Sequence, residues 1–248
     1  MKKQFLLLVF FSLFSLCGYA QVGEAGNWGG GVDHEILHFG FTFQYISSEY
    51  KIYKKPSWQS RYPATQDAPI PLFTDSLKSI SSPVAPGFGL GFVTNLRLGP
   101  NADLRFTPAL VFVDRLLEYR YPDETVVPKQ VKSTVVDFPL GIKLKSDRRR
   151  NFRAYLLAGG KYSMDIISKK KFDDTDKILT EKFVKNNKNI LSYEVGIGFD
   201  FYFEYFKLSP ELKLSNSINS VLTPEDHPFS SPLEKLYTRN FQFSLYFE

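Results

Sequence analysis

Strict alternation of apolar and polar residues is the feature that most constrains how this chain can fold. Between residues 38 and 45, every second residue is Phe or Tyr, and the residues between them are His, Gly, Thr and Gln. Side chains two positions apart lie on the same face of a β-strand, so this pattern predicts a strand with one apolar and one polar face. The same pattern recurs in seven more segments, at residues 88–98, 104–112, 136–144, 152–158, 193–203, 206–214 and 237–247.

Each segment has roughly ten residues, which is long for a soluble strand but is the length that a tilted membrane strand requires. A soluble β-sandwich and a membrane barrel both produce such alternation, because the barrel turns its apolar face to lipid and its polar face to the lumen. The connections distinguish the two: they are short at 99–101, at 146–151 and near Tyr205, and long at about 47–86, 116–130, 165–189 and 216–235. Outer-membrane barrels alternate tight periplasmic turns with long extracellular loops in this way, and a soluble sandwich has no reason to.

We therefore predict an all-β chain that forms a closed antiparallel eight-stranded transmembrane outer-membrane β-barrel. Closure is required because every backbone N–H and C=O in hydrocarbon must be paired inside the protein. An even number of strands leaves both termini on the periplasmic side. The lumen of such a barrel is about wide enough to be filled by side chains, so a wide protein-conducting pore is not expected.

The N-terminus has the composition of an export signal. A basic start is followed by an apolar run at residues 6–16 and by small residues around Gly18–Ala20, which is the order that a signal peptidase recognises. We expect residues 1–20 to be a cleaved signal peptide and residues 21–248 to be the barrel domain. Cleavage removes Cys17, the single cysteine, so the mature chain has no thiol chemistry.

The charge and the motifs of the chain do not indicate a ligand. The net charge of +5 is small and dispersed, so it does not suggest a nucleic-acid partner. The sequence has no cluster of His, Asp and Glu with the spacing of metal ligands. Gly87–Gly91 lies on a predicted strand with no helix after it, unlike a phosphate-binding loop. We expect no cofactor, no metal and no small-molecule substrate.

An enzymatic function can be argued only from His38, which falls on the inward-facing positions of the first strand. A few outer-membrane enzymes are eight-stranded barrels with a site made of serine, histidine and an acid. No motif in this sequence connects a serine to His38, so we interpret it as a hydrogen-bonded lumen histidine. An outer-membrane lipid hydrolase or acyltransferase that uses His38 stays open as an alternative.

Charged residues of both signs occupy the inward-facing positions of several predicted strands. Enclosed charges must pair or stay hydrated. We therefore predict a network of ion pairs that braces the barrel, in which Arg105 and Lys143 lie close to inward carboxylates. The candidate members are Arg105, Asp137, Lys143, Glu194, Asp200 and Glu204, and Lys207 and Glu211 share the same face.

Two surfaces outside the strands carry residues suited to binding another protein. Arg148, Arg149 and Arg150 form a basic turn on the predicted periplasmic side, which is either a solvated turn near lipid headgroups or a docking point for an acidic partner. The longest loop contains Trp58 and Tyr62, and such aromatic residues are enriched at protein interfaces. A stand-alone small barrel of surface or adhesive type, with its loops as the active part, stays open as an alternative.

Several strands resemble those of small outer-membrane barrels from Bacteroidota, namely residues 131–145 (VKSTVVDFPLGIKLK) and 151–160 (NFRAYLLAGG). Residues 95–98 (NLRL) and 103–108 (DLRFTP) are more specifically similar to the PorT family of the type IX secretion and gliding system. The resemblance covers most of the mature chain. It implies a non-enzymatic accessory of type IX protein secretion and gliding motility, in contact with outer-membrane lipid and other secretion components. The chain departs from such barrels at Glu248, which follows the expected final aromatic residue.

Overall fold

The structure is a computed structural model that describes residues 35–62, 74–166 and 182–248. The predicted signal peptide lies outside these residues. No helix in the described ranges is long and apolar enough to cross a membrane. The strands are β1 (Leu37–Lys54), β2 (Ser79–Ser81), β3 (Ala85–Arg97), β4 (Ala102–Phe106), β5 (Ala109–Arg120), β6 (Val126–Lys145), β7 (Phe152–Asp165), β8 (Lys185–Asn186), β9 (Asn189–Tyr202), β10 (Lys207–Ser217), β11 (Leu222–Thr223) and β12 (Leu233–Phe247).

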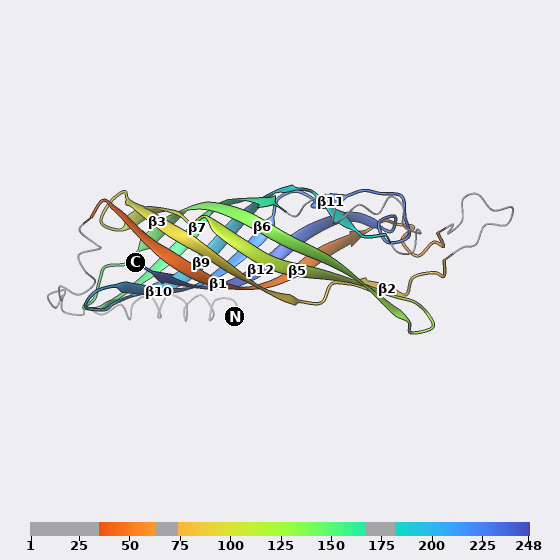
Figure 1. The fold of residues 1–248 in the computed structure, drawn as a ribbon, viewed down its shortest axis with the longest axis horizontal. Helices are drawn as coiled ribbons and strands as arrows, with labels where there is room; N and C mark the ends of the chain where they lie inside the picture. Colours follow the sequence, from red (N-terminus) through yellow and green to blue (C-terminus); the bar gives the residue numbers. More distant parts are fainter. Residues whose placement is uncertain (1–34, 63–73, 167–181) are drawn as a thin grey trace, which may run out of the picture.

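The long strands close into a ring, and each strand is tilted relative to the long axis of the molecule (Figure 1). Antiparallel pairs link β1, β3, β5, β6, β7, β9, β10 and β12 in that order, and β12 pairs back with β1. The short strand β4 shares both neighbours of β5, so the two act as one strand that is interrupted at Thr107 and Pro108. Proline has no N–H to donate, but the Pro108 carbonyl still accepts a hydrogen bond from Phe92 N at 3.0 Å. The prediction of a closed antiparallel barrel of eight strands is confirmed.

In the half of the barrel that holds the short turns, apolar side chains point outward and polar side chains point inward. The side chains that the alternation assigns to the lipid face are all exposed on the outer wall: Phe41, Phe92, Leu140, Ile197 and Phe243. Gln44 and Ser244, assigned to the lumen, are buried. A soluble sandwich buries its apolar face, so this half of the barrel presents its surface to lipid.

The polarity of the two faces reverses along the longest strands. On β1 the outward positions pass from Tyr45 to Glu49 and Lys51. The inward positions pass from Gln44 to Tyr50. Beyond the reversal the strands have the polar-out, apolar-in pattern of a soluble β-protein, so they extend past the membrane into water. We call this part, at the end with the long connections, the cap.

The cap has a hydrophobic core of its own, to which strands and connections both contribute. β2 pairs with the end of β5, and β8 pairs with β11 beside the ring, at the right of Figure 1. The core contains Tyr50, Leu77, Ile80, Leu117, Tyr119, Val131, Val184, Ile190, Val221, Leu222, Phe229, Leu233 and Leu236. The described parts of the long connections therefore fold into this core at one end of the barrel.

The prediction of a long loop between residues 116 and 130 is wrong. Strands β5 and β6 continue through this segment, where Leu116 pairs with Gln130, and only residues 121–125 form the turn. The segment keeps the burial alternation of a strand, but several of its outward residues are polar, namely Glu118, Arg120 and Gln130. It therefore lacks the apolar outer face that identifies a lipid-facing strand, although its backbone is just as regular.

An aromatic side chain lies across a glycine in the middle of the lumen wall. Tyr155 on β7 pairs with Gly198 on β9, and both face inward. A Cβ atom at Gly198 would lie 2.3 Å from Tyr155 Cζ. The absence of a side chain at position 198 is therefore what allows the Tyr155 ring to lie flat against the wall and reach the centre of the lumen.

Replacement of Gly198 by Ala is expected to destabilise the barrel by about 1–3 kcal/mol, because the added methyl group displaces the Tyr155 ring in a packed interior. Denaturant unfolding of the purified barrel in detergent measures the change. Gly160→Ala is the control, since its nearest contact would be Ser192 O at 3.9 Å. Equal stability of the two variants would contradict this account of Gly198.

Candidate functional site

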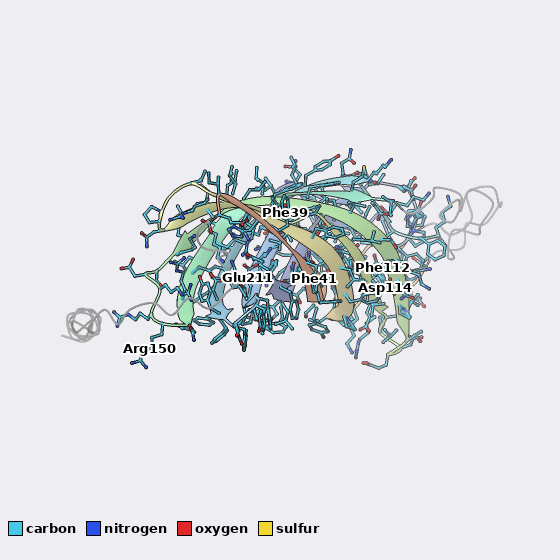
Figure 2. The ribbon with its side chains drawn as sticks, turned by 60° about the vertical axis from the view of Figure 1, so that its left-hand side comes forward. Phe39, Phe41, Phe112, Asp114, Arg150 and Glu211 are labelled. Atoms are coloured by element: carbon cyan, nitrogen blue, oxygen red, sulfur yellow. The ribbon has the colours of Figure 1, made fainter. Side chains whose placement is uncertain are left out.

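The centre of the membrane half of the lumen is occupied by Arg105, which β4 directs inward. Its Nη1 lies 3.1 Å from Glu211 Oε2 and its Nη2 lies 2.9 Å from Glu248 Oε1. Its Nε donates to Asn95 Oδ1 at 2.8 Å. The guanidinium also lies over the Tyr246 ring, with Cζ 4.5 Å from the ring centroid. These side chains come from β3, β4, β10 and the end of β12, so the cluster ties opposite walls of the barrel together (Figure 2 labels Glu211 among the strands).

Three lysines near the short turns extend this network. Lys143 Nζ lies 2.8 Å from both carboxylate oxygens of Asp200, and it also lies 3.9 Å from the centroid of the Tyr155 ring. Lys207 Nζ lies 2.5 Å from Glu248 Oε2. Nearer the end, Lys145 Nζ lies 2.6 Å from Asp103 Oδ1. Buried ion pairs require good geometry to offset the cost of desolvation. The short distance between the charged atoms of each of these pairs meets this requirement.

Two further pairs lie toward the cap. Lys213 Nζ lies 3.2 Å from Glu194 Oε1 and 3.4 Å from Glu211 Oε1. Lys161 Nζ lies 3.1 Å from Asp137 Oδ2, and Ser163 Oγ donates to Asp137 Oδ1 at 2.6 Å. Acids and bases therefore alternate through the lumen, and the Lys213–Glu194 and Lys161–Asp137 pairs each join neighbouring strands.

The structure brings together most of the candidate lumen residues, although not all in the predicted pairs. Lys143 pairs with Asp200, whereas Arg105 pairs with Glu211 and with Glu248. The interpretation of Glu204 as a lumen residue is wrong. The strand β9 ends at Tyr202, and Glu204 lies exposed in the turn before β10.

Glu248 is the main member of the network that the sequence analysis missed. Glu248 departs from the usual aromatic end of such barrels, and its side chain is fully buried in the lumen. The alternation of the last strand predicts an inward side chain at position 248, because this position continues the inward series of Ser244 and Tyr246. Gly40 makes room for this arrangement, since a Cβ atom there would meet Phe247 O.

Side chains fill the lumen of the described barrel almost completely. Inside the ring, a cavity of about 20 Å³ lies between the charged network and the cap, and this volume holds about one water molecule. A small apolar cluster of Ile46, Ala109, Val111 and Val113 adjoins it. The prediction that the lumen has no space for a folded protein agrees with this packing.

The basic turn between β6 and β7 contains one arginine that packs against the barrel and two that are exposed. Arg148 lies over the Tyr202 ring, 3.7 Å from its centroid, and its Nε donates to Arg150 O at 2.7 Å. Arg149 and Arg150 are exposed, and Arg150 has a positive φ of 53°. Figure 2 shows Arg150 at the end of the barrel.

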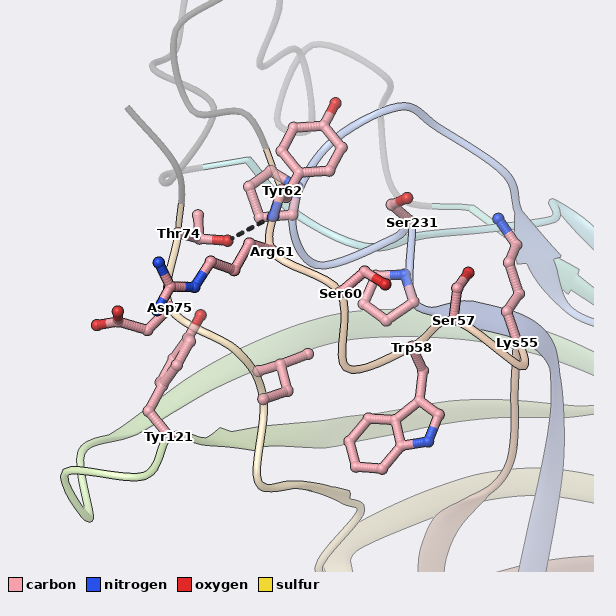
Figure 3. Close-up of a pocket in the computed structure, with 13 residues that line it drawn as sticks. Lys55, Ser57, Trp58, Ser60, Arg61, Tyr62, Thr74, Asp75, Tyr121 and Ser231 are labelled. Carbon is pink, nitrogen blue, oxygen red and sulfur yellow. Dashed lines mark hydrogen bonds between the residues drawn. The ribbon is translucent and has the colours of Figure 1, made fainter. Parts of the chain in front are cut away.

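Trp58 and Tyr62 are half-buried parts of the cap rather than free surface anchors. Trp58 packs against the cap core, and Lys54 Nζ lies 4.1 Å from its ring centroid. The Tyr62 hydroxyl donates to Asp226 Oδ1 at 2.9 Å, and burial together with this hydrogen bond raises the pKa of Tyr62 to about 12. Both residues line a pocket of about 140 Å³ (Figure 3).

His38 does not form a catalytic pair with a serine in the described residues. Its Nε2 lies 3.7 Å from Glu248 Oε2, and its Nδ1 has no hydrogen-bond partner there. No group of three or more His, Cys, Asp and Glu side chains in these ranges is arranged to hold a metal ion. The arrangement around His38 is that of a lumen residue at the edge of the charged network.

A closed ring of eight strands, with apolar residues outside and a charged lumen inside, defines a small barrel of the outer-membrane type. The chain belongs to the family of outer membrane protein beta-barrel domains, which matches residues 36–223. It is therefore an outer-membrane β-barrel protein.

Solved structures of other outer-membrane proteins are similar to this chain. The outer membrane protein OprG from Pseudomonas aeruginosa is 12% identical, with a TM-score of 0.43 over 85% of this chain and 93% of that chain. Neisserial surface protein A (NspA) is 10% identical, with a TM-score of 0.40 over 86% of this chain and 98% of that chain. No curated protein matches the chain by sequence.

Proposed function

We propose that this outer-membrane barrel is an accessory of the type IX secretion and gliding machinery, and that it acts by contact with other secretion components. The observation that carries the proposal is the filled lumen. With Arg105, Lys143 and their carboxylates packed across the ring, the barrel has no path for a folded cargo. A function in protein export must then depend on the outer surfaces of the molecule.

The similarity to the PorT family supports this assignment. The residues that carry it, 95–98 and 103–108, lie on and directly after β3 and β4, which pair with each other. They include Asn95, Asp103 and Arg105, all members of the charged lumen network. The similarity therefore involves the internal bracing of the barrel, which is the part that a rigid docking scaffold requires.

The exposed basic turn is the docking surface that we favour. Arg149 and Arg150 project from the end of the barrel with the short turns, which is the periplasmic end in outer-membrane barrels. An acidic surface on a periplasmic or inner-membrane-anchored partner would complement them. Trp58 and Tyr62 are less suited to this role because they are already engaged within the cap.

A stand-alone surface barrel is the second candidate, and the folded cap favours it. The cap has its own hydrophobic core and a pocket of about 140 Å³, which is more structure than a loop needs if it only connects strands. The lipid hydrolase or acyltransferase alternative has less support, because His38 is associated with Glu248 and not with a serine in the described residues.

Deletion of the gene is expected to leave type IX cargo proteins unsecreted or to abolish gliding, while outer-membrane integrity stays normal. The proteins of the culture medium, the motility of single cells and sensitivity to large antibiotics measure these three properties. A deletion strain that secretes and glides normally would remove the type IX assignment and leave the stand-alone surface barrel as the better proposal.

The combined replacement of Arg149 by Gln and Arg150 by Asn is expected to weaken binding to the partner about fivefold, since exposed charge pairs contribute up to about 1 kcal/mol. Asparagine tolerates the positive φ at position 150, and Arg148 is retained because it packs on Tyr202. Secretion and co-purification with partners measure the effect. The matched control neutralises two exposed lysines of the cap, Lys132 and Lys235. A larger loss in the control would place the docking surface at the cap.

A further inference from the structure

One buried arginine of the lumen has no carboxylate partner among the described residues. Arg115, on β5, is 4% exposed. Its Nε donates to Ser48 Oγ at 3.0 Å, and Ser48 Oγ in turn donates to Asn240 Oδ1 at 2.7 Å. The guanidinium Cζ lies 5.8 Å from the centroid of the Tyr50 ring. Its Nη1 is buried and has no hydrogen-bond partner within the part of the chain that the structure describes.

Arg115 differs in this respect from six other buried cations of the lumen. Six buried cations of the described barrel each lie within ion-pair distance of a carboxylate: Arg105, Lys143, Lys145, Lys161, Lys207 and Lys213. Burial of an unpaired charge is costly, and a buried ionic group is normally compensated by a counter-charge. A guanidinium stays protonated in proteins, so Arg115 does not relieve this cost by losing its charge.

Arg115 lines the cavity of about 20 Å³ inside the ring. The other charged residues that line it in the described structure are Lys161 and Asp137, so the lining carries a net charge of +1. Neutral hydrogen-bonding groups surround the rest of the space: Ser163, Ser192, Thr238 and Asn240. Ile46, Val111, Val113, Val135 and Ile190 complete the wall.

The size and the charge of the cavity select the class of ligand. A volume of about 20 Å³ accommodates one species the size of a water molecule, which is too small for a phosphate or an organic carboxylate. The net positive charge disfavours a cation. A halide ion meets both conditions, and it accepts hydrogen bonds from guanidinium and hydroxyl groups.

We infer that this cavity is a binding site for one small monovalent anion of the halide class, held by Arg115 Nη1 between the charged network and the cap. The anion supplies the counter-charge that the described residues do not provide at Arg115. The site does not depend on the role proposed above in secretion. It makes the packing of the cap onto the membrane half responsive to the anion.

The test uses the protein purified from outer membranes in detergent, with potassium gluconate as the background salt because gluconate is too large for the cavity. Chloride is titrated, and its binding is followed by the line width of the ³⁵Cl magnetic resonance signal. Saturable broadening that bromide reverses is expected. Arg115→Gln is expected to weaken chloride binding at least about tenfold, because a charge-assisted hydrogen bond and its counter-charge are lost. The control Arg239→Gln removes an exposed arginine of the cap and is expected to leave binding unchanged.

A second variant gives a change that misfolding does not produce. Asp137→Asn removes the carboxylate of the cavity lining and is expected to tighten chloride binding at least about fivefold, since the local charge becomes more positive. This result would support the site even if Arg115→Gln failed to fold. The absence of saturable chloride binding by the unmodified protein would overturn the inference. Binding that survives Arg115→Gln in a folded barrel, or that Asp137→Asn leaves unchanged or weakens, would overturn it as well.

Discussion

Replacement of Arg105 by Met is expected to destabilise the barrel by about 3–5 kcal/mol, which is the cost of breaking a buried ion pair by removing one partner. Arg105 bonds to Glu211 and to Glu248, and both carboxylates are fully buried. Methionine fills much of the same volume but leaves the carboxylates with less compensating charge. Urea unfolding of the barrel in micelles, followed by the heat-dependent shift in gel mobility, measures the change.

A double-mutant cycle separates this electrostatic effect from a simple loss of packing. Glu211→Gln combined with Arg105→Met is expected to be less destabilising than the sum of the two single changes, with a coupling of about 0.5–3 kcal/mol. The control Arg239→Met changes an exposed arginine and is expected to alter stability by no more than about 0.5 kcal/mol. Strict additivity of Arg105 and Glu211 would show that the ion pair does not brace the barrel.

Replacement of Ile197 by Arg is expected to cost about 2–4 kcal/mol, because the charge then lies on the lipid face near the middle of the bilayer. Ile197 is exposed on the outer wall, where its cross-strand neighbours are Leu156 and Leu212. Aromatic residues bound this stretch of β9 on both sides, at Tyr193 and Phe201. Such residues mark the two interfaces of the membrane, which places Ile197 between them.

The matched control for Ile197→Arg is Val126→Arg. Val126 is a β-branched, exposed residue at the start of β6, in the cap, where the outer wall meets water. The same substitution there is expected to cost no more than about 0.5 kcal/mol. Refolding into lipid vesicles at a series of urea concentrations compares the two variants. Equal costs at both positions would contradict the assignment of the membrane half.

The membrane half of the fold could be predicted from the sequence because side-chain direction in a strand has a fixed period of two. The alternation placed Phe41, Phe92 and Phe243 on the lipid face and Gln44 and Ser244 in the lumen. Lipid then requires a closed ring, because an open strand edge leaves backbone groups unpaired in hydrocarbon. Local sequence and the membrane environment thus determine both the fold class and the orientation of each strand.

The partners inside the lumen were decided by the tertiary structure. Arg105 and Glu248 are 143 positions apart in the chain, and they meet only because ring closure and strand stagger bring β4 to face the end of β12. A pattern of period two gives the face on which a charge lies, but not its height within the lumen. This is why the sequence could place Arg105, Lys143 and Asp200 on the inward face but could not identify which of the enclosed charges pair.

The cap shows the same limit at the level of whole segments. Residues 116–120 and 126–130 keep the burial alternation of a strand, but their outward positions mix polar residues such as Glu118 and Gln130 with apolar ones such as Val126, so the sequence did not distinguish a loop from a strand that continues into water. Glu204 follows the alternation of β9 but lies beyond the last residue of that strand. The sequence by itself determined which side chains face lipid, since each strand carries that information locally. Which strands continue, where they turn and which buried charges pair depend on contacts between distant segments, and only the folded ring brings these together.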